Sequence, residues 1–255
     1  MSAHKRLFTL LELLAVICVI LVLLSMMMPV MSSYQEKARR LVCLSSMKQI
    51  GIGLMGYAAS NRNRVPTRDS DSSQYPGMLS QDNTDSGAFG RTFNQVLPGI
   101  FDYDTGKGTE LFTCSSQRFS ARQMWLNNSS RWRCIGFFYW SIVRDVTWSF
   151  PLGKSNFNSG RISDVDSKTP LLSDPIAYDG QILFNANHVK NGYSGNGYVP
   201  IGLGFGGNGG NYNTSGTPTG INQLHADGSG RWYGSEKFKK VYKTYWGWDM
   251  YAGHE

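Results

Sequence analysis

The chain has 255 residues, a net charge of +7 and 41% hydrophobic residues, so it is long enough for one or two domains with a sizeable core. Charged residues make up 17% and aromatic residues 13%, a balance that excludes a disordered chain. Four cysteines in this length exclude a small domain held together by a disulfide framework. Residues 61–255 carry 19 basic and 16 acidic side chains, so we expect no nucleic-acid partner.

A long apolar segment follows a short basic N-terminus that contains Lys5 and Arg6. The segment, residues 8–31, contains only four residues that are not apolar: Thr9, Glu12, Ser25 and Pro29. As an α-helix it measures about 36 Å, more than the hydrocarbon thickness of about 30 Å. It therefore predicts a single membrane-spanning helix, and the basic residues before it predict a cytoplasmic N-terminus with the rest of the chain on the other side.

Glu12 is the acidic residue within this apolar segment. A carboxyl group inside a membrane is costly, and such a residue is a candidate functional site by default. A secretory signal peptide has a shorter apolar region that ends in a small-residue cleavage site, and neither feature is present. A plain membrane anchor gives Glu12 no role.

Residues 6–14, Arg-Leu-Phe-Thr-Leu-Leu-Glu-Leu-Leu, resemble the processing segment of type IV prepilins and of type II secretion pseudopilins. The resemblance implies that a prepilin peptidase removes residues 1–7 as a leader peptide and that the new N-terminal residue, Phe8, is methylated. It also implies that Glu12 pairs with the N-terminal amine of a neighbouring subunit. Leu7 precedes the implied cleavage site, where the family has glycine.

An amphipathic stem continues the apolar segment over residues 32–60. This stretch has no proline, and its apolar residues recur at spacings of three and four: Tyr34, Ala38, Leu41, Leu44, Met47, Ile50, Leu54 and Tyr57. That spacing places them on one face of an α-helix. Pro29 lies where pilins often have a helix-bending proline, and an interior proline removes a backbone hydrogen bond. We therefore predict one long helix over residues 8–60, with a transmembrane and assembly half over 8–31.

The stem carries a second resemblance. Residues 38–57, with Cys43 near their start, are similar to the corresponding stretch of a large group of pilin-like proteins. Near the C-terminus, that group has a hairpin with Asp-Gly at its turn, here Asp227-Gly228. A histidine precedes that hairpin in the group, and His188 matches it here.

Three glycines in the stem formally match a dinucleotide-binding fingerprint: Gly51, Gly53 and Gly56. That fingerprint requires a strand before the glycines and a helix that opens within them. These glycines lie inside a helical pattern, so we interpret them as points where the helix packs closely against a sheet.

The remainder, residues 61–255, has short apolar runs between turn-forming residues. Four runs predict strands: 110–114, 134–143, 170–173 and 181–184. Residues 67–88 predict a loop, and residues 221–233 predict a hairpin with alternating flanks. We therefore expect the α+β fold class: a pilin-like long N-terminal helix packed on an antiparallel β-sheet head with long loops. A Gly/Asn-rich insertion occupies about residues 191–220.

No sequence motif for catalysis is present, so we do not expect an enzyme. The four histidines form no H-x-x-x-H pair, and there is no C-x-x-C, nucleophile elbow or phosphate-binding loop. We interpret His188 and His225 as structural hydrogen-bonding residues. Calcium is the one cofactor with candidate ligands, which are oxygen donors near predicted turns: Asp174, Asp179, Asn185, Asn187 and Asp227. Turns also use these residue types for their own backbone.

Three of the cysteines, Cys43, Cys114 and Cys134, are expected to face an oxidising compartment. Cys18 lies in the apolar segment, whereas the other three follow it. Cys43 and Cys114 match recurrent cysteine positions in the group of pilin-like proteins, so the resemblance favours a disulfide between them. Pairing of Cys114 with Cys134, or a fully reduced chain, remains an alternative.

Two classes of function compete. The resemblance implies a filament subunit of a type II secretion pseudopilus or a type IV pilus-like filament. Its implied partners are other pilin or pseudopilin subunits, a prepilin peptidase, the inner-membrane assembly platform and the lipid bilayer. Its implied location is the inner membrane, which it crosses once, with a periplasmic or extracellular head. The alternative is a membrane-anchored binding protein that never polymerises, with glycans as ligands because all seven tryptophans lie in the head.

Overall fold

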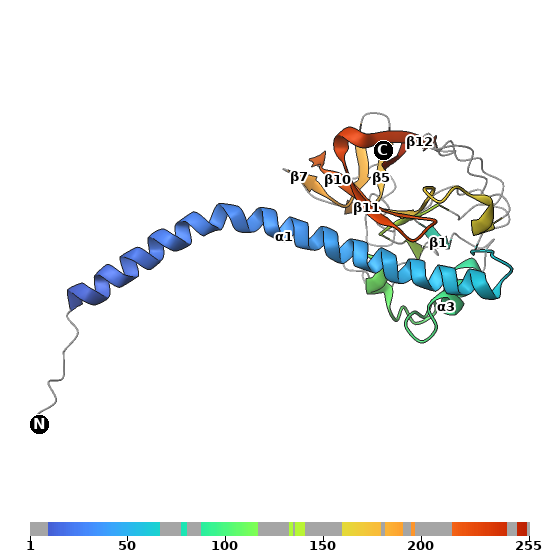
Figure 1. The fold of residues 1–255 in the computed structure, drawn as a ribbon, viewed down its shortest axis with the longest axis horizontal. Helices are drawn as coiled ribbons and strands as arrows, with labels where there is room; N and C mark the ends of the chain where they lie inside the picture. Colours follow the sequence, from blue (N-terminus) through green and yellow to red (C-terminus); the bar gives the residue numbers. More distant parts are fainter. Residues whose placement is uncertain are drawn as a thin grey trace, which may run out of the picture. The chain divides into compact units, whose positions relative to one another are not determined.

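The computed structural model describes ten stretches of the chain: residues 10–66, 78–80, 88–116, 133–134, 136–140, 160–179, 182–190, 195–196, 216–243 and 249–253. The chain divides into two compact units, one up to Arg39 and one from Arg40 to Glu255. Helix α1 (Leu10–Ser60) contributes to both units (Figure 1). The predicted cleavage and methylation residues, Leu7 and Phe8, lie outside the described residues.

The N-terminal part of α1 is apolar and exposed. Within the described residues, Leu10–Met27 is the one stretch of helix long and apolar enough to cross a membrane, with a mean hydropathy of 2.9 and no buried side chain. The helix continues through Pro29 to Ser60. An apolar surface of this extent is unfavourable in water, so lipid or protein must cover it.

Two antiparallel sheets, of four and five strands, form most of the described β structure of the second unit. The first has the order β11-β10-β4-β3: Gly230–Gly234, Gly220–His225, Pro170–Ser173 and Phe138–Tyr139. The second has the order β12-β13-β5-β6-β8: Phe238–Lys243, Asp249–Gly253, Ile176–Asp179, Ile182–Ala186 and Gly195–Asn196. The model therefore has an apolar N-terminal helix and antiparallel sheet, which is the expected α+β class.

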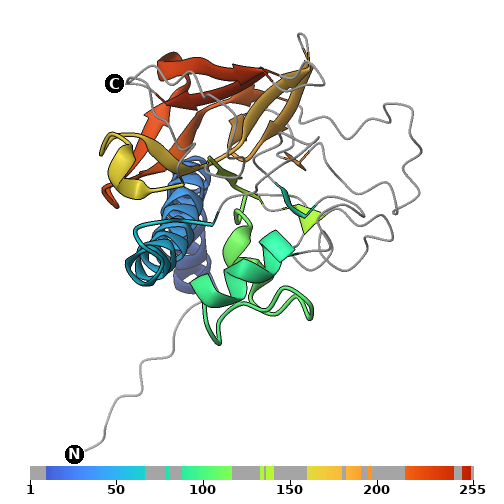
Figure 2. The same ribbon diagram turned by 90° about the vertical axis from the view of Figure 1, so that its right-hand side faces the viewer.

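The first sheet lies between α1 and the second sheet. On the α1 side, Leu224 of β10 belongs to the same buried core as four fully buried stem residues: Cys43, Met47, Ile50 and Leu54. On the opposite side, Ile221 of β10 packs with Ile176 and Ala186 of the second sheet. In Figure 2 the strands of both sheets lie on one side of α1, and α3 (Ala88–Val96) lies near the other.

The C-terminal hairpin has the predicted position but not the predicted burial. Strands β10 and β11 pair from Gly220↔Gly234 to Leu224↔Gly230, and Gly228 adopts a left-handed φ of 79° in the connecting turn. All six residues of β10 are buried. The predicted alternation was wrong for this strand because β10 is central and packed on both faces.

The other predicted strands agree with the structure to different degrees. β4 coincides with the run 170–173, and β6 overlaps 181–184. The run 110–114 was wrong, because Thr109–Phe112 forms the 3-10 helix η1. Phe112 is buried there, and a short apolar run does not by itself distinguish a buried turn from a strand.

Most of the predicted loop, residues 67–77 and 81–87, lies outside the described residues, and short elements occupy the described parts of this loop and of one long predicted strand. The loop over 67–88 contains β1 (Met78–Ser80), and α3 begins at its end. β1 pairs with β2 (Arg133–Cys134). Because β2 ends at Cys134 and β3 is a separate strand, the run 134–143 does not form one strand. Two further 3-10 helices and one strand pair complete the described elements: η3 (Ile162–Asp164), η5 (Ser235–Lys237), and β7 (Val189–Lys190) with β9 (Thr217–Pro218). β7 and β9 join the two ends of the Gly/Asn-rich insertion.

Two of the stem glycines are close-packing positions. A Cβ atom on Gly51 would collide with the Leu224 side chain of β10. One on Gly53 would lie 2.5 Å from the Val96 backbone oxygen, at the end of α3. Gly56 has no atom within 4 Å of that position. Thus Gly51 packs on the sheet, as the sequence interpretation required, whereas Gly53 packs on a helix.

We expect Gly53→Ala to lower the free energy of unfolding by about 1 to 2 kcal/mol, because a rigid backbone oxygen must move and this outweighs the gain in helix propensity. Gly56→Ala is the matched control and should raise stability by up to about 1 kcal/mol, because it gains propensity without a collision. Thermal unfolding of the full chain in detergent, followed by tryptophan fluorescence, measures both. Equal stability of the two variants would contradict the packing role of Gly53.

Candidate functional site

Glu12 lies in the first turn of α1. A negative charge in that position is favoured by the helix dipole. The side chains around it are exposed leucines: Leu10, Leu11, Leu13 and Leu14 are between 54% and 85% exposed. Glu12 is therefore a carboxyl group set in an apolar surface that needs a cover of lipid or of other helices.

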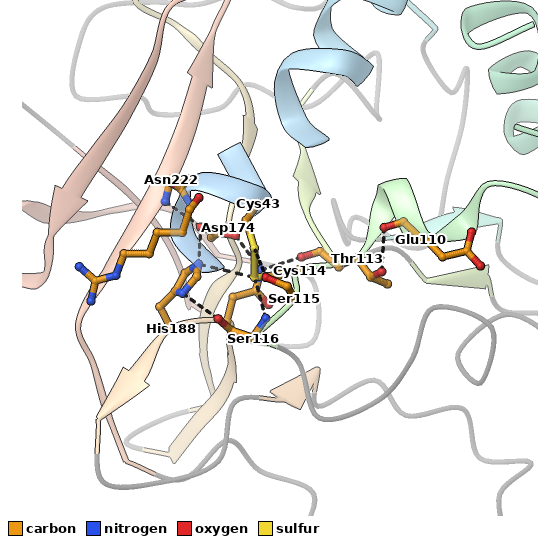
Figure 3. Close-up of a disulfide and its surroundings, with 12 residues drawn as sticks. Cys43, Glu110, Thr113, Cys114, Ser115, Ser116, Asp174, His188 and Asn222 are labelled. Carbon is orange, nitrogen blue, oxygen red and sulfur yellow. Dashed lines mark hydrogen bonds and ion pairs between the residues drawn. A yellow bond between two sulfur atoms is a disulfide. The ribbon is translucent and has the colours of Figure 1, made fainter. Parts of the chain in front are cut away.

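A disulfide joins the stem to the head. Cys43 of α1 and Cys114, two residues after η1, are bonded with their Cα atoms 5.1 Å apart (Figure 3). This is the pair that the resemblance favoured over Cys114–Cys134. Both cysteines are buried, at 0% and 3% exposure, so the bond is part of the core. Cys18 is an exposed free cysteine in the apolar part of α1.

A buried Asp–His pair lies against the disulfide. The Nε2 atom of His188 is 3.2 Å from Asp174 Oδ2 and 3.5 Å from Cys114 Sγ. The other ring nitrogen, Nδ1, is 3.2 Å from Ser116 Oγ. Figure 3 shows the imidazole beside both the carboxyl group and the disulfide. Four kinds of polar atom thus converge, and all of them except the Ser116 hydroxyl belong to buried residues.

Further hydrogen bonds hold Asp174 in place. Its Oδ1 accepts a bond from Asn187 Nδ2 at 2.7 Å, and its Oδ2 accepts one from the Asn222 backbone N–H at 2.7 Å. Asn187 Nδ2 also donates to the Gly136 carbonyl at 2.9 Å. The network therefore connects the end of β4, the turn after β6 and the central strand β10. Buried polar groups with full sets of partners fix their neighbours in one arrangement.

Arg40 and Trp232 close one side of this network. The Arg40 guanidinium lies 3.9 Å from the centre of the Trp232 ring, and the His188 ring meets Trp232 edge-to-face at 5.2 Å. Arg40 also donates to Thr219 Oγ1 at 3.2 Å, and the Thr219 N–H donates to the His188 carbonyl at 2.9 Å. A cation over an indole face is a favourable contact when it is partly shielded from water.

The two tryptophans that the structure describes make contacts within the protein. Trp140 is fully buried and its indole N–H donates to Ser173 Oγ at 3.0 Å. The Trp232 ring contacts the Arg40 guanidinium and the His188 ring. The other five lie outside the described residues.

The predicted calcium ligands do not share one centre among the described side chains. Asp174 and Asn187 are neighbours, but Asn187 presents its amide nitrogen to the carboxyl group. Asp227 lies in the hairpin turn, where it accepts a bond from the Ser229 N–H at 2.8 Å and pairs with Lys168 at 3.3 Å. The side chains of the two remaining candidates, Asp179 and Asn185, lie outside the described residues.

His225 is the second buried histidine and is hydrogen-bonded on both ring nitrogens. Nδ1 lies 3.1 Å from the Ser229 carbonyl, and Nε2 lies 3.0 Å from Gln223 Nε2 and 3.2 Å from the Tyr233 hydroxyl. Burial lowers the pKa of His225 below its ordinary value of 6.5, against the opposing charge of Asp227. Burial raises the pKa of Asp227, but bonds from Ser229 and Lys168 outweigh it and bring that pKa to about 2.

We expect the wild-type chain to lose stability as the pH falls from 7 to 5, in part through His225. Its pKa is lower in the folded state, so the unfolded state takes up a proton first, below about pH 6.5. The stabilisation is complete above that pH and is lost as the pH falls through the folded pKa. In His225→Gln the slope of unfolding free energy against pH should be shallower over this range. Urea titrations at several pH values test this, and identical slopes would contradict it.

The central pairing of this site was not visible in the sequence. In the sequence, Asp174 is a candidate calcium ligand because it supplies oxygen atoms near a predicted turn. His188 matches the histidine that precedes the hairpin in the group of pilin-like proteins. Ser116, Asn222 and Arg40 were not expected to take part. The available signal was the run of polar residues directly after apolar ones, as in Ser173-Asp174 and Asn187-His188, which is typical of strand ends.

Comparison with known proteins gave no match, either to a protein-family profile, to a curated protein sequence or to a solved structure. What these residues do is therefore inferred from their own geometry and sequence.

Proposed function

We propose that the chain is a pilin-like or pseudopilin subunit. It is anchored in the inner membrane by the N-terminal part of α1 and assembles through that helix into a type II secretion pseudopilus or a type IV pilus-like filament. The observation that carries the proposal is an exposed apolar helix that contains Glu12 and continues into a stem packed on a β-rich head. The prepilin-like residues 6–14 support it.

The processing and orientation of the subunit follow from the same segment. A prepilin peptidase removes residues 1–7 and leaves a methylated Phe8. Lys5 and Arg6 keep the N-terminus on the cytoplasmic side, so the head lies in the periplasm or outside the cell. A disulfide such as Cys43–Cys114 is typical of proteins in such oxidising compartments.

Glu12 acts in assembly. In a filament its carboxylate pairs with the N-terminal amine of Phe8 on a neighbouring subunit. Such a pair adds little net stability in an apolar bundle, because desolvation offsets the Coulomb attraction. A subunit in the wrong axial register leaves both charges unpaired, so the pair selects the register. The inner-membrane assembly platform then receives correctly aligned subunits.

The test compares Glu12→Ala with Glu36→Ala, which removes the other acidic residue of α1. Glu12→Ala should fractionate with membranes at least as completely as the wild type, because it removes a polar group from the span. It should be absent from filaments sheared off cells that also express the wild type. Glu36→Ala should enter both fractions. Normal incorporation of Glu12→Ala, or a mature mass that retains residues 1–7, would favour a membrane-anchored binding protein instead.

A further inference from the structure

We propose that Cys43, Cys114, Asp174 and His188 form a zinc site when the disulfide is reduced. Their ligand atoms, two sulfurs, a carboxylate oxygen and an imidazole nitrogen, all lie within 4.8 Å of one another (Figure 3). All four residues are buried. Two thiolates with one nitrogen and one oxygen ligand suit Zn²⁺, whereas Ca²⁺ requires oxygen ligands throughout.

Two of the spacings between ligand atoms are close to those of a tetrahedral zinc centre. Zinc–ligand distances of about 2.3 Å to sulfur and about 2.1 Å to nitrogen and oxygen require about 3.6 Å between sulfur and nitrogen and about 3.4 Å between nitrogen and oxygen. The distance from Cys114 Sγ to His188 Nε2 is 3.5 Å, and that from His188 Nε2 to Asp174 Oδ2 is 3.2 Å. The two sulfurs must also separate to about 3.8 Å once their bond is broken. The ligand atoms, which lie within 4.8 Å of one another, must then draw together around the metal.

The groups behind these ligands also suit a metal. Ligating histidines normally donate their second ring N–H to an oxygen atom, which fixes the ring and its tautomer. Ser116 Oγ is placed to accept that bond from His188 Nδ1, at 3.2 Å. Asn187 and the Asn222 N–H orient the Asp174 carboxyl group in the same way. The site is therefore held in shape by hydrogen bonds independent of the disulfide.

The chemistry balances with a dithiol as the reductant. The dithiol gives two electrons and two protons to the Cys43–Cys114 bond, which becomes two thiols, while the dithiol becomes a disulfide. Zn²⁺ then displaces the two thiol protons into solvent and remains divalent. His188 changes tautomer, so that its proton lies on Nδ1 and Nε2 faces the metal. A disulfide of the same class as the oxidised reductant reverses the step: it takes two electrons from the thiolates and two protons from solvent and becomes a dithiol, while the two sulfurs join and Zn²⁺ is released. The disulfide and the metal therefore exclude each other.

The test uses the full chain in detergent with Cys18 and Cys134 replaced by serine, so that Cys43 and Cys114 are the remaining thiols. After anaerobic reduction and removal of the reductant, Co²⁺ serves as the spectroscopic probe. We expect one Co²⁺ per chain, a sulfur-to-metal charge-transfer band, tetrahedral ligand-field bands, and displacement by Zn²⁺. The oxidised chain should show none of these. Reduced chain that is folded by circular dichroism but retains no Co²⁺ would overturn the proposal.

Variants separate a built site from thiol binding alone. His188→Gln should weaken Co²⁺ and Zn²⁺ binding by more than tenfold, and Ser116→Ala by about tenfold through loss of ring orientation. His225→Gln is the matched control, because it changes a buried histidine of another network, and it should bind as the wild type does. If reduction unfolds the chain, Zn²⁺ should restore the native circular dichroism. Binding unaffected by His188→Gln, or no recovery on addition of Zn²⁺, would refute the assignment.

Discussion

Replacing both Cys43 and Cys114 by alanine is expected to lower the free energy of unfolding by about 4 kcal/mol. The bond links residues 71 positions apart. Closing a loop of that length removes roughly 15 cal/mol/K of entropy from the unfolded chain, or about 4 kcal/mol at 25 °C. For the unit that begins at Arg40, this corresponds to a fall in melting temperature of about 8 to 16 °C.

Thermal and urea unfolding of the full chain in detergent measure this effect. Cys18→Ala is the matched control, because Cys18 is exposed and unbonded in the apolar part of α1, and it should leave the melting temperature of the head unchanged. The single variant Cys43→Ala should lose nearly as much as the double variant, since either change opens the loop. A double variant within about 1 kcal/mol of the control would contradict a stabilising role for the bond.

Asp174→Ala is expected to lower the free energy of unfolding by about 3 to 5 kcal/mol, because it removes a buried carboxylate that three buried polar groups contact. His188 Nε2, Asn187 Nδ2 and the Asn222 N–H all lie within 3.2 Å of its carboxyl oxygens. No water reaches these groups to replace the lost bonds, since Asp174 and His188 are each at most 1% exposed.

The matched control for Asp174 is Asp104→Ala, which also removes a carboxylate from an ion pair. Asp104 accepts three bonds from Arg91, one at 2.8 Å and two at 3.0 Å, but both side chains are about half exposed. Exposed pairs of this kind contribute about 0.2 to 1 kcal/mol. Urea unfolding of both variants compares them directly. A loss for Asp174→Ala no larger than for Asp104→Ala would show that the buried network does not stabilise the fold.

The long helix and the later part of its apolar stripe were predictable because periodicity is a local property. The earlier part of the predicted stripe was wrong as a buried face, because Tyr34, Ala38 and Leu41 are exposed. Met47, Ile50 and Leu54 follow the spacing of a helix face, and each is fully buried. The position of the C-terminal hairpin was predictable for the same reason, since Asp227-Gly228 supplies a turn between two apolar flanks. These features depend on residues close together in the chain.

The rest depends on contacts between distant segments. β10 is buried on both faces because the stem covers one face and the second sheet covers the other. The sequence of β10 alone does not indicate that a second sheet is present. η1 resembled a strand because its apolar residues face the core in either conformation. Asp174, His188 and Cys114 meet only after β4, β6 and the segment following η1 converge, so their spacing in the sequence carried no sign of the site.

The disulfide also determines how the chain would carry mechanical load. Tension applied to α1 ahead of Cys43 passes through the sulfur bridge directly to Cys114, so the intervening residues bear none of it while the bridge lasts. Those residues include the rest of the stem, with Ile50 and Leu54. Fully extended, the segment between the two cysteines would measure roughly 240 Å, at about 3.4 Å per residue over 71 residues, and the disulfide prevents this extension. Reduction of the disulfide would replace this short covalent connection with a long, flexible one.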